Sequence, residues 1–377
     1  MSQHLLPGSY EDLYFRGQAL AQAGETEQAI ELFSRLVDRL GRLSESVFAR
    51  REGLRNVQLR ACLELAGLFR SEGRYAEAIE AEGRLLQTHP DRAAVWRRDL
   101  AVLRMSAGAV DEGLRELRGL ADESPDDLWN WLVLANEARI EGRLVESEAA
   151  YTRALDVAGR QQEAEQDPKV LAEIHFGRFR LHEAFGQLDE AVAAWETAVR
   201  HEPTVKHSVR SVYQMLTAAG RYEQALEYVA RDENAMQAGF QRGIIAELSG
   251  DTVQAAKELD AVAALDPMQF EQGHDCWAEA VLRQKDPMPL LQQLRQLLSS
   301  HGSIRLLILS GIAWAMHGEK DLAHGVFEQS ISLLKRSRPA KQKLDGADWR
   351  LLTSLVDDEE MRASLKPYFA VVERVLE

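Results

Sequence analysis

LWNWLVLANEARIEGRLVESEAAYTRALDVAG, residues Leu128–Gly159, is the stretch that decides the fold. Apolar and small residues of its first half recur at steps of three and four: Trp131, Leu134, Ala135 and Ala138. Those of its second half do the same after a turn at Gly142 and Arg143: Leu144, Ser147, Tyr151 and Ala154. This period predicts two amphipathic helices joined by a short turn. Because one helix pair cannot bury such faces alone, we expect similar pairs on both sides.

Similar turn glycines occur along the whole chain: Gly24, Gly73, Gly108, Gly142, Gly186, Gly220, Gly250 and Gly318. Their spacings are 49, 35, 34, 44, 34, 30 and 68 residues. The last spacing is twice 34, which predicts a degenerate repeat at about 270–301, where Pro287 and Pro289 break the helix instead of a glycine. The two longer spacings predict helical insertions at about 41–59 and 160–170. We interpret the first as a lengthened helix that runs into the second unit.

Positions around each turn agree in register. The residue five positions after each glycine is small in all eight units: Ala29, Ala78, Gly113, Ser147, Ala191, Ala225, Ala255 and Ala323. The residue seven positions before it is small in six, with Phe179 and Tyr213 the two exceptions. The residue nine positions after it is large and apolar or aromatic except at Glu82. Proline stands 17 positions after four of the glycines, where it ends the second helix.

A helix–turn–helix period of 34 residues with this register resembles the tetratricopeptide-repeat family over nearly the whole chain. The resemblance implies an all-α, right-handed solenoid of about nine helix pairs over residues 1–339. Residues 340–377 are expected to form capping helices, with Leu365, Phe369, Val372 and Leu376 as one apolar stripe. The resemblance also implies a non-enzymatic scaffold that binds another protein.

Composition narrows the class further. The chain has 377 residues, is 45% hydrophobic and carries a net charge of −15, which argues against a nucleic-acid partner. Cys62 and Cys276 stand far apart, so no structural disulfide is expected and a reducing compartment fits. The most apolar stretch, Leu306–Met316, is too short to span a bilayer. We expect a cytoplasmic protein.

No catalytic motif is present among the phosphate-binding, zinc-protease and nucleophile-elbow patterns. His274, Asp275 and Cys276 are immediate neighbours, so on a helix they point in different directions and cannot form one site. His175 and His182 are two turns apart, farther than a chelating pair. We therefore expect neither an enzyme, nor a metal, nor a cofactor.

The candidate binding surface is the concave face, which the first helix of each repeat lines in this family. Eight residues in that register are the candidate partner-binding residues: Arg98, Trp129, Asn136, Arg139, Arg180, Lys206, Arg210 and Phe240. Arginines interleaved with aromatic residues on an otherwise acidic protein favour an acidic segment or a C-terminal carboxylate as partner. The opposing interpretation is that these arginines pair with acids on adjacent helices.

One subgroup of the family grips the terminal carboxylate of chaperone tails with a clamp of Lys, Asn and Arg residues. Asn136, Lys206 and Arg210 match that clamp, whereas Leu132 and Gly177 replace two of its members. The main hypothesis is therefore an adaptor or scaffold whose groove holds a partner protein or peptide. The alternatives are a regulatory subunit whose superhelix changes on ligand binding and a homo-oligomer that buries its own groove.

Overall fold

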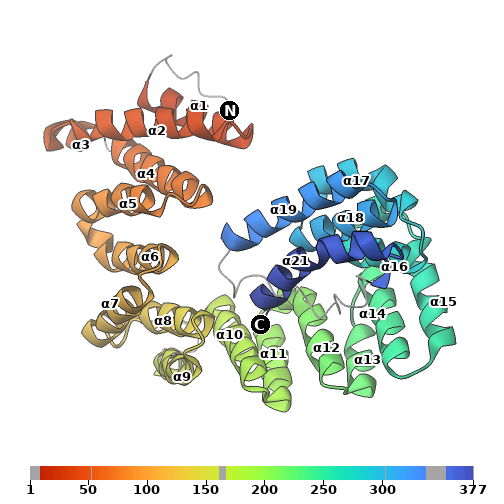
Figure 1. Cartoon of the computed structure of the whole chain (residues 1–377). Helices are drawn as coiled ribbons and strands as arrows, with labels where there is room; N and C mark the ends of the chain where they lie inside the picture. The colour runs from red at the N-terminus through yellow and green to blue at the C-terminus, as the bar shows by residue number, and fades with distance from the viewer. Residues whose placement is uncertain (1–8, 52, 161–166, 302, 337–353, 377) are drawn as a thin grey trace. The chain divides into compact units, whose positions relative to one another are not determined.

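The computed structural model describes residues 9–51, 53–160, 167–301, 303–336 and 354–376. All regular structure within these ranges is helical, and successive helices pair into antiparallel hairpins (Figure 1). The chain divides into two compact units, Met1–Gln161 and Gln162–Glu377. The prediction of an all-α solenoid built from helix pairs is confirmed.

In the ranges that the structure describes, the first unit contains four hairpins and one additional short helix. In chain order its α-helices are α1 (Tyr10–Gln22), α2 (Thr26–Gly41), α3 (Glu45–Arg50), α4 (Gly53–Ser71), α5 (Tyr75–Thr88), α6 (Ala93–Ser106), α7 (Val110–Glu123), α8 (Leu128–Ile140) and α9 (Leu144–Arg160). One short 3-10 helix, Pro90–Arg92, precedes α6. The core of the N-terminal hairpins is continuous from Tyr14 on α1 to Leu103 on α6.

The second unit contains five hairpins and a final helix within the described residues. Its α-helices are α10 (Pro168–Phe185), α11 (Leu188–His201), α12 (Val209–Ala218), α13 (Tyr222–Val229), α14 (Ala235–Leu248), α15 (Thr252–Ala263), α16 (His274–Arg283), α17 (Met288–His301), α18 (Ile304–Met316), α19 (Lys320–Arg336) and α21 (Glu359–Leu376). Leu365 and Phe369 of α21 are buried in the same core as Phe327 of α19. The preceding part of the expected cap, at residues 337–353, lies outside the described residues.

Each of the eight turn glycines ends a first helix in the left-handed conformation, with φ between 72° and 97°. At Gly142 the N–H of Arg143 donates to the carbonyl of Ala138 (2.8 Å) and that of Gly142 to Arg139 (3.1 Å). This pair of bonds is a Schellman C-cap, which favours glycine because any Cβ is strained at positive φ. In the degenerate repeat Lys285 takes this place at φ 60°. The turn therefore exists there without its glycine, and Pro289 falls in the first turn of α17.

The small residues sit where the two helices of a hairpin touch. A Cβ on Gly17 would lie 2.7 Å from the ring of Phe33, and one on Gly311 would lie 2.8 Å from the ring of Phe327. Ser147 is fully buried, and its hydroxyl donates to the carbonyl of Ala135 (2.8 Å). The small residues that recur in the sequence repeat are therefore the ones at which the two helices of a hairpin are in contact.

Two local expectations differ from the structure. The insertion after α2 is not one lengthened helix, because the chain leaves helical geometry at Arg51 (φ −136°, ψ 70°) and α4 begins afresh at Gly53. Trp131 is only half-buried rather than a core residue, and its indole N–H donates to the carbonyl of Pro125 (2.8 Å). An indole beside an exposed loop satisfies its polar end in this way while its ring still covers apolar surface.

Candidate functional site

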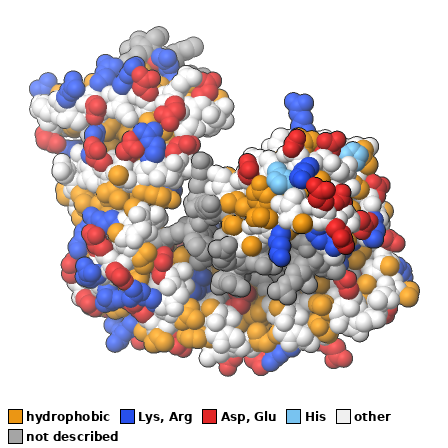
Figure 2. Space-filling view, in the orientation of Figure 1, with side chains coloured by type: hydrophobic (Ala, Val, Ile, Leu, Met, Phe, Trp, Pro, Cys, Tyr) orange, Lys and Arg blue, Asp and Glu red, His pale blue; other side chains and the backbone are white. Residues whose placement is uncertain are grey.

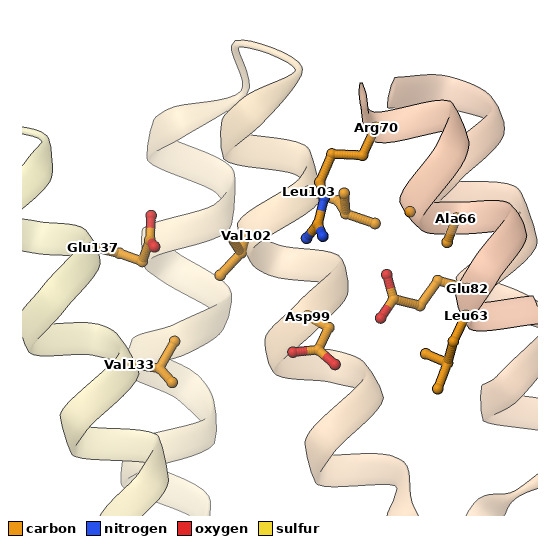
Figure 3. Close-up of a pocket in the computed structure, with 10 residues that line it drawn as sticks. Leu63, Ala66, Arg70, Glu82, Asp99, Val102, Leu103, Val133 and Glu137 are labelled. Carbon is orange, nitrogen blue, oxygen red and sulfur yellow. The ribbon is translucent and has the colours of Figure 1, made fainter. Parts of the chain in front are cut away.

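A cavity of about 340 Å³ opens in the first unit between α4, α5, α6 and α8. Its lining combines apolar side chains with four charged ones: Leu63, Ala66, Gly67, Arg70, Glu82, Asp99, Val102, Leu103, Val133 and Glu137 (Figure 3). Mixed apolar walls with a few convergent polar groups are typical of binding sites rather than of packing defects.

The repeat register explains why these residues meet. Asp99 on α6 and Val133 on α8 both stand nine positions before their turn glycine. Gly67 on α4 and Val102 on α6 both stand six positions before theirs. Residues at these spacings share one face of a helix, so consecutive first helices present them to the same side. Gly67 adds no side chain, which leaves space beside α4.

Glu82 closes the cavity from α5, at the position where the other hairpins carry a large apolar or aromatic residue. Its residue is only 6% exposed, and its carboxyl shares a hydrogen bond with Asp99. Burial, together with the charge of Asp99, raises the pKa of Glu82 to about 8. At neutral pH Glu82 therefore keeps its proton, which it donates to Asp99.

Arg70 faces this carboxyl pair, as Figure 3 shows. Its positive charge lowers the pKa of both Glu82 and Asp99, although burial outweighs it and the net shift of each is upward. The side chain of Arg70 forms no hydrogen bond or ion pair with any other residue in the part of the chain that the structure describes. Glu137, which is buried, lies beyond Val102 from this group.

Apolar side chains surround the cavity on the first helices. Leu63 on α4 is 39% exposed, and Trp129 on α8 is 45% exposed. Val95 on α6 is a third exposed residue of this kind and stands in the same register as Trp129. Hydrophobic side chains also form a band across the first unit in the space-filling view (Figure 2).

The sequence-predicted residues of the first unit have different surroundings. Arg98 is buried, and its guanidinium donates to Asp127 (2.9 Å) and Asn130 (2.7 Å), so it holds α6 against the start of α8. Asn136 is half-buried and accepts a hydrogen bond from Tyr151. Arg139 is half-buried, and its Nε lacks a hydrogen-bond partner among the described residues. Of this group, Trp129 and Arg139 keep groups available for a partner.

The sequence-predicted residues of the second unit contact other side chains of the protein or lie in its core. Arg180 donates to Glu183 (3.2 Å) and Ser211 (3.0 Å) and covers the ring of Phe179. Lys206 pairs with Glu233 (2.7 Å) at the surface. Phe240 is buried in the core.

Arg210 belongs to a largely buried ionic network. It pairs with Asp275 (2.9 Å), and Arg305 pairs with Glu279 (2.6 Å) beside them. The charges of Arg210 and Arg305 hold the pKa of Asp275 at about 2 despite its burial. For Arg210 the structure supports the opposing interpretation, in which the arginines pair with acids on adjacent helices.

The cysteines and histidines that the sequence analysis considered as possible sites are buried or packed against other side chains. Cys62 and Cys276 are free and buried, and burial raises their pKa to about 11 and about 12, so both remain thiols at neutral pH. His175 stacks on His201, with a centroid distance of 5.6 Å. The described residues contain no group of three His, Cys, Asp or Glu side chains arranged to hold a metal ion. Nor does any described helix have the length and apolar character needed to cross a bilayer.

Hairpins with a period near 34 residues, a left-handed turn residue and close contact between small residues recur through both units. The chain has the helix-hairpin fold of a tetratricopeptide-repeat solenoid. Most of its repeats follow the pattern of the family, whereas Glu82 and Lys285 depart from it. Glu82 was visible in the sequence as a break in the register, and it is the signal that could have located the cavity. Asp99 and Glu137 carried no such signal.

The chain was compared with known families, curated proteins and solved structures. No family model matches the chain, and no curated protein matches its sequence. A solved tetratricopeptide-repeat protein from Parabacteroides merdae is 13% identical, with 94% of this chain and 99% of that one covered and a TM-score of 0.37. YrrB, described as having an unusual peptide-binding site, is 14% identical over 50% of this chain and 94% of its own, with a TM-score of 0.37.

The Cut9–Hcn1 hetero-tetramer of the APC/C also matches. The identity is 14%, the match covers 98% of this chain and 76% of that one, and the TM-score is 0.35. Nothing about the ligand or partner of the present repeat protein follows from these values.

Proposed function

We propose that this protein is a non-enzymatic scaffold that binds an extended segment of another protein on the first-helix face of its first unit. The face is formed by α4, α6 and α8, and the cavity holds one side chain of the bound segment. The cavity carries this proposal, because it joins buried charged groups to exposed apolar ones on neighbouring first helices. Extended segments are bound in this way by apolar anchors that flank a specific polar pocket.

The exposed side chains supply the anchors. Leu63 and Trp129 are large, apolar and accessible, and each lies on a helix that lines the cavity. Aromatic anchors beside a desolvated pocket contribute a large share of the binding free energy in protein interfaces. The free, buried thiols fit a reducing compartment, so we place the protein in the cytoplasm.

An acidic segment or terminal carboxylate is the second candidate ligand for this face. Arg70 on α4 and Arg139 on α8 favour it, because both stand three positions before their turn glycine and neither forms an ion pair with a described residue. Arg210 pairs with Asp275, and Lys206 pairs with Glu233 at the surface, so the support for an acidic ligand comes from the arginines of the first unit.

The proposal is tested by affinity capture from cell extract with the full chain as bait. Leu63→Glu introduces a charge at the edge of the cavity. Val145→Glu is the matched control, because Val145 is 77% exposed on α9 and lies away from the cavity lining. We expect Leu63→Glu to lower partner recovery by at least about ten-fold, equivalent to about 1.4 kcal/mol, and Val145→Glu to leave it unchanged. Equal recovery with both variants, each with wild-type helicity, would place the interface elsewhere.

A further inference from the structure

We propose that the cavity of the first unit accepts one basic side chain, Lys or Arg, from the bound segment, and that this cation replaces the proton shared by Glu82 and Asp99. The inference rests on the proposed function and names the chemistry of its ligand. It goes beyond the acidic ligand that the arginine pattern of the sequence favoured.

The carboxyl groups of the lining carry the argument. Glu82 and Asp99 contribute two carboxyls from two helices, and Arg70 is the one guanidinium among the residues that line the cavity. Glu82 is nine-tenths buried, yet it forms no ion pair within the described residues, and its hydrogen-bond partner is another carboxyl. Arg70 compensates only part of the desolvation of this carboxyl, because burial still raises its pKa.

A basic side chain would supply that compensation. Its N–H groups can donate to both carboxylates, and hydrogen bonds between charged groups are roughly twice as strong as neutral ones. A carboxylate ligand would gain Arg70 but would approach Asp99, whose like charge opposes it. The apolar walls of Val102, Leu103 and Val133 suit the methylene stem of Lys or Arg.

Binding would then release a proton. Before binding, Glu82 is protonated and donates to Asp99; after binding, the cation occupies the site, the O–H bond of the carboxyl is broken and the proton is transferred to water. The charged groups that face the pair are Arg70 from α4, Arg98 from α6 and Glu137 from α8. Because the pKa of Glu82 is raised to about 8, the affinity should rise with pH up to that value and level off above it.

The test selects extended peptides from a random display library against the full chain at pH 7.5. Selected peptides are synthesised with blocked ends and without histidine, so that the peptide itself does not titrate between pH 6 and pH 9. Each is compared with versions in which a single Lys or Arg is replaced by norleucine, Gln or Glu. Affinity is measured for the wild type, for Glu82→Gln, and for the matched control Glu80→Gln, whose side chain on the same helix is 71% exposed.

We expect one basic position in the selected peptides, with norleucine there weakening binding at least ten-fold. The affinity of the wild type and of Glu80→Gln should rise by up to about ten-fold per pH unit below pH 8, which is the limit for release of one proton, and Glu82→Gln should remove that rise. Peptides that bind at this face, as shown by loss with Leu63→Glu, but that need no basic residue or prefer Glu, would overturn the inference and leave the proposed function standing. Peptides insensitive to Leu63→Glu, or no selected peptide at all, would overturn both.

Discussion

Lys285 shows at the scale of one residue how the repeat tolerates a missing glycine. It adopts φ 60° in the turn between α16 and α17, where the equivalent residue in the other eight hairpins is glycine. A side chain in the left-handed region costs about 1–2 kcal/mol. Lys285 also pairs with Asp357 at 3.8 Å, but both side chains are mostly exposed, so this contact offsets little of the cost.

We therefore predict opposite effects from two substitutions at equivalent turns. Lys285→Gly should raise the free energy of unfolding by about 1 kcal/mol because it relieves the positive φ, and Gly142→Ala should lower it by about the same amount. No atom lies within 4 Å of a Cβ placed on Gly142, so backbone conformation alone is tested there. Urea denaturation measures both changes; a destabilising Lys285→Gly would refute this account of the turn.

Arg210 and Lys206 look alike in the sequence and differ in the structure. Arg210→Glu should destabilise the second unit by about 3–5 kcal/mol, because it leaves Asp275 buried beside a second negative charge. Lys206→Glu should cost less than about 1 kcal/mol, since Lys206 and Glu233 are both well exposed. Thermal unfolding of the two variants compares them, and similar losses would contradict the assignment of Arg210 to an internal network.

Residues that pack within a hairpin could be predicted from the sequence, and the partners of charged residues could not. Ala135 and Ser147 meet as their register indicated, since both belong to one local repeat. Asp275 lies 65 residues from Arg210, and its approach depends on how successive hairpins stack. Three of the four arginines predicted to line the concave face, Arg98, Arg180 and Arg210, form ion pairs within the protein.

At the scale of elements, α21 packs apolar side chains against α19. The ring of Phe369 packs edge-on against that of Phe327 on α19 with centroids 5.2 Å apart, and Tyr368 stacks on the same ring at 5.7 Å. Leu365 is fully buried between them and the core of the unit. We propose that α21 caps the last hairpin, which would otherwise expose its apolar face to water.

Leu365→Ala should therefore weaken the cap. Truncating a fully buried leucine costs about 2–5 kcal/mol, so amides of α18 and α19 should exchange with solvent faster in hydrogen-exchange mass spectrometry. Lys366→Ala, at an exposed position of the same helix, is the control and should leave exchange unchanged. Unaltered protection of α19 in Leu365→Ala would mean that α21 does not stabilise the last hairpin.

Helix identities were predictable at this scale, and some boundaries were not. The prolines that were predicted to end second helices follow the ends of these helices, as at Pro90 after α5 and Pro203 after α11. The break at Arg51 was not visible, because Val47, Leu54 and Val57 keep a helical period on both sides of it. A period reports which face is apolar and is unaffected by a local interruption that preserves that face.

At the scale of the whole molecule, the chain divides into two compact units, Met1–Gln161 and Gln162–Glu377. Each repeat in such proteins contacts mainly its neighbours, so the period fixes the hairpins without fixing where one core ends. The repeat period alone does not predict the cavity either. It depends on three successive first helices and on one second-helix residue, Glu82, that departs from the pattern.

The most direct test of the central claim is a hydrogen-exchange footprint of the full chain with a bound partner segment, in wild type and in Leu63→Glu. The account predicts slower exchange on α4, α6 and α8, with the second unit unchanged and the protection lost in the variant. Protection confined to the second unit, or protection of the first unit that survives Leu63→Glu, would contradict it.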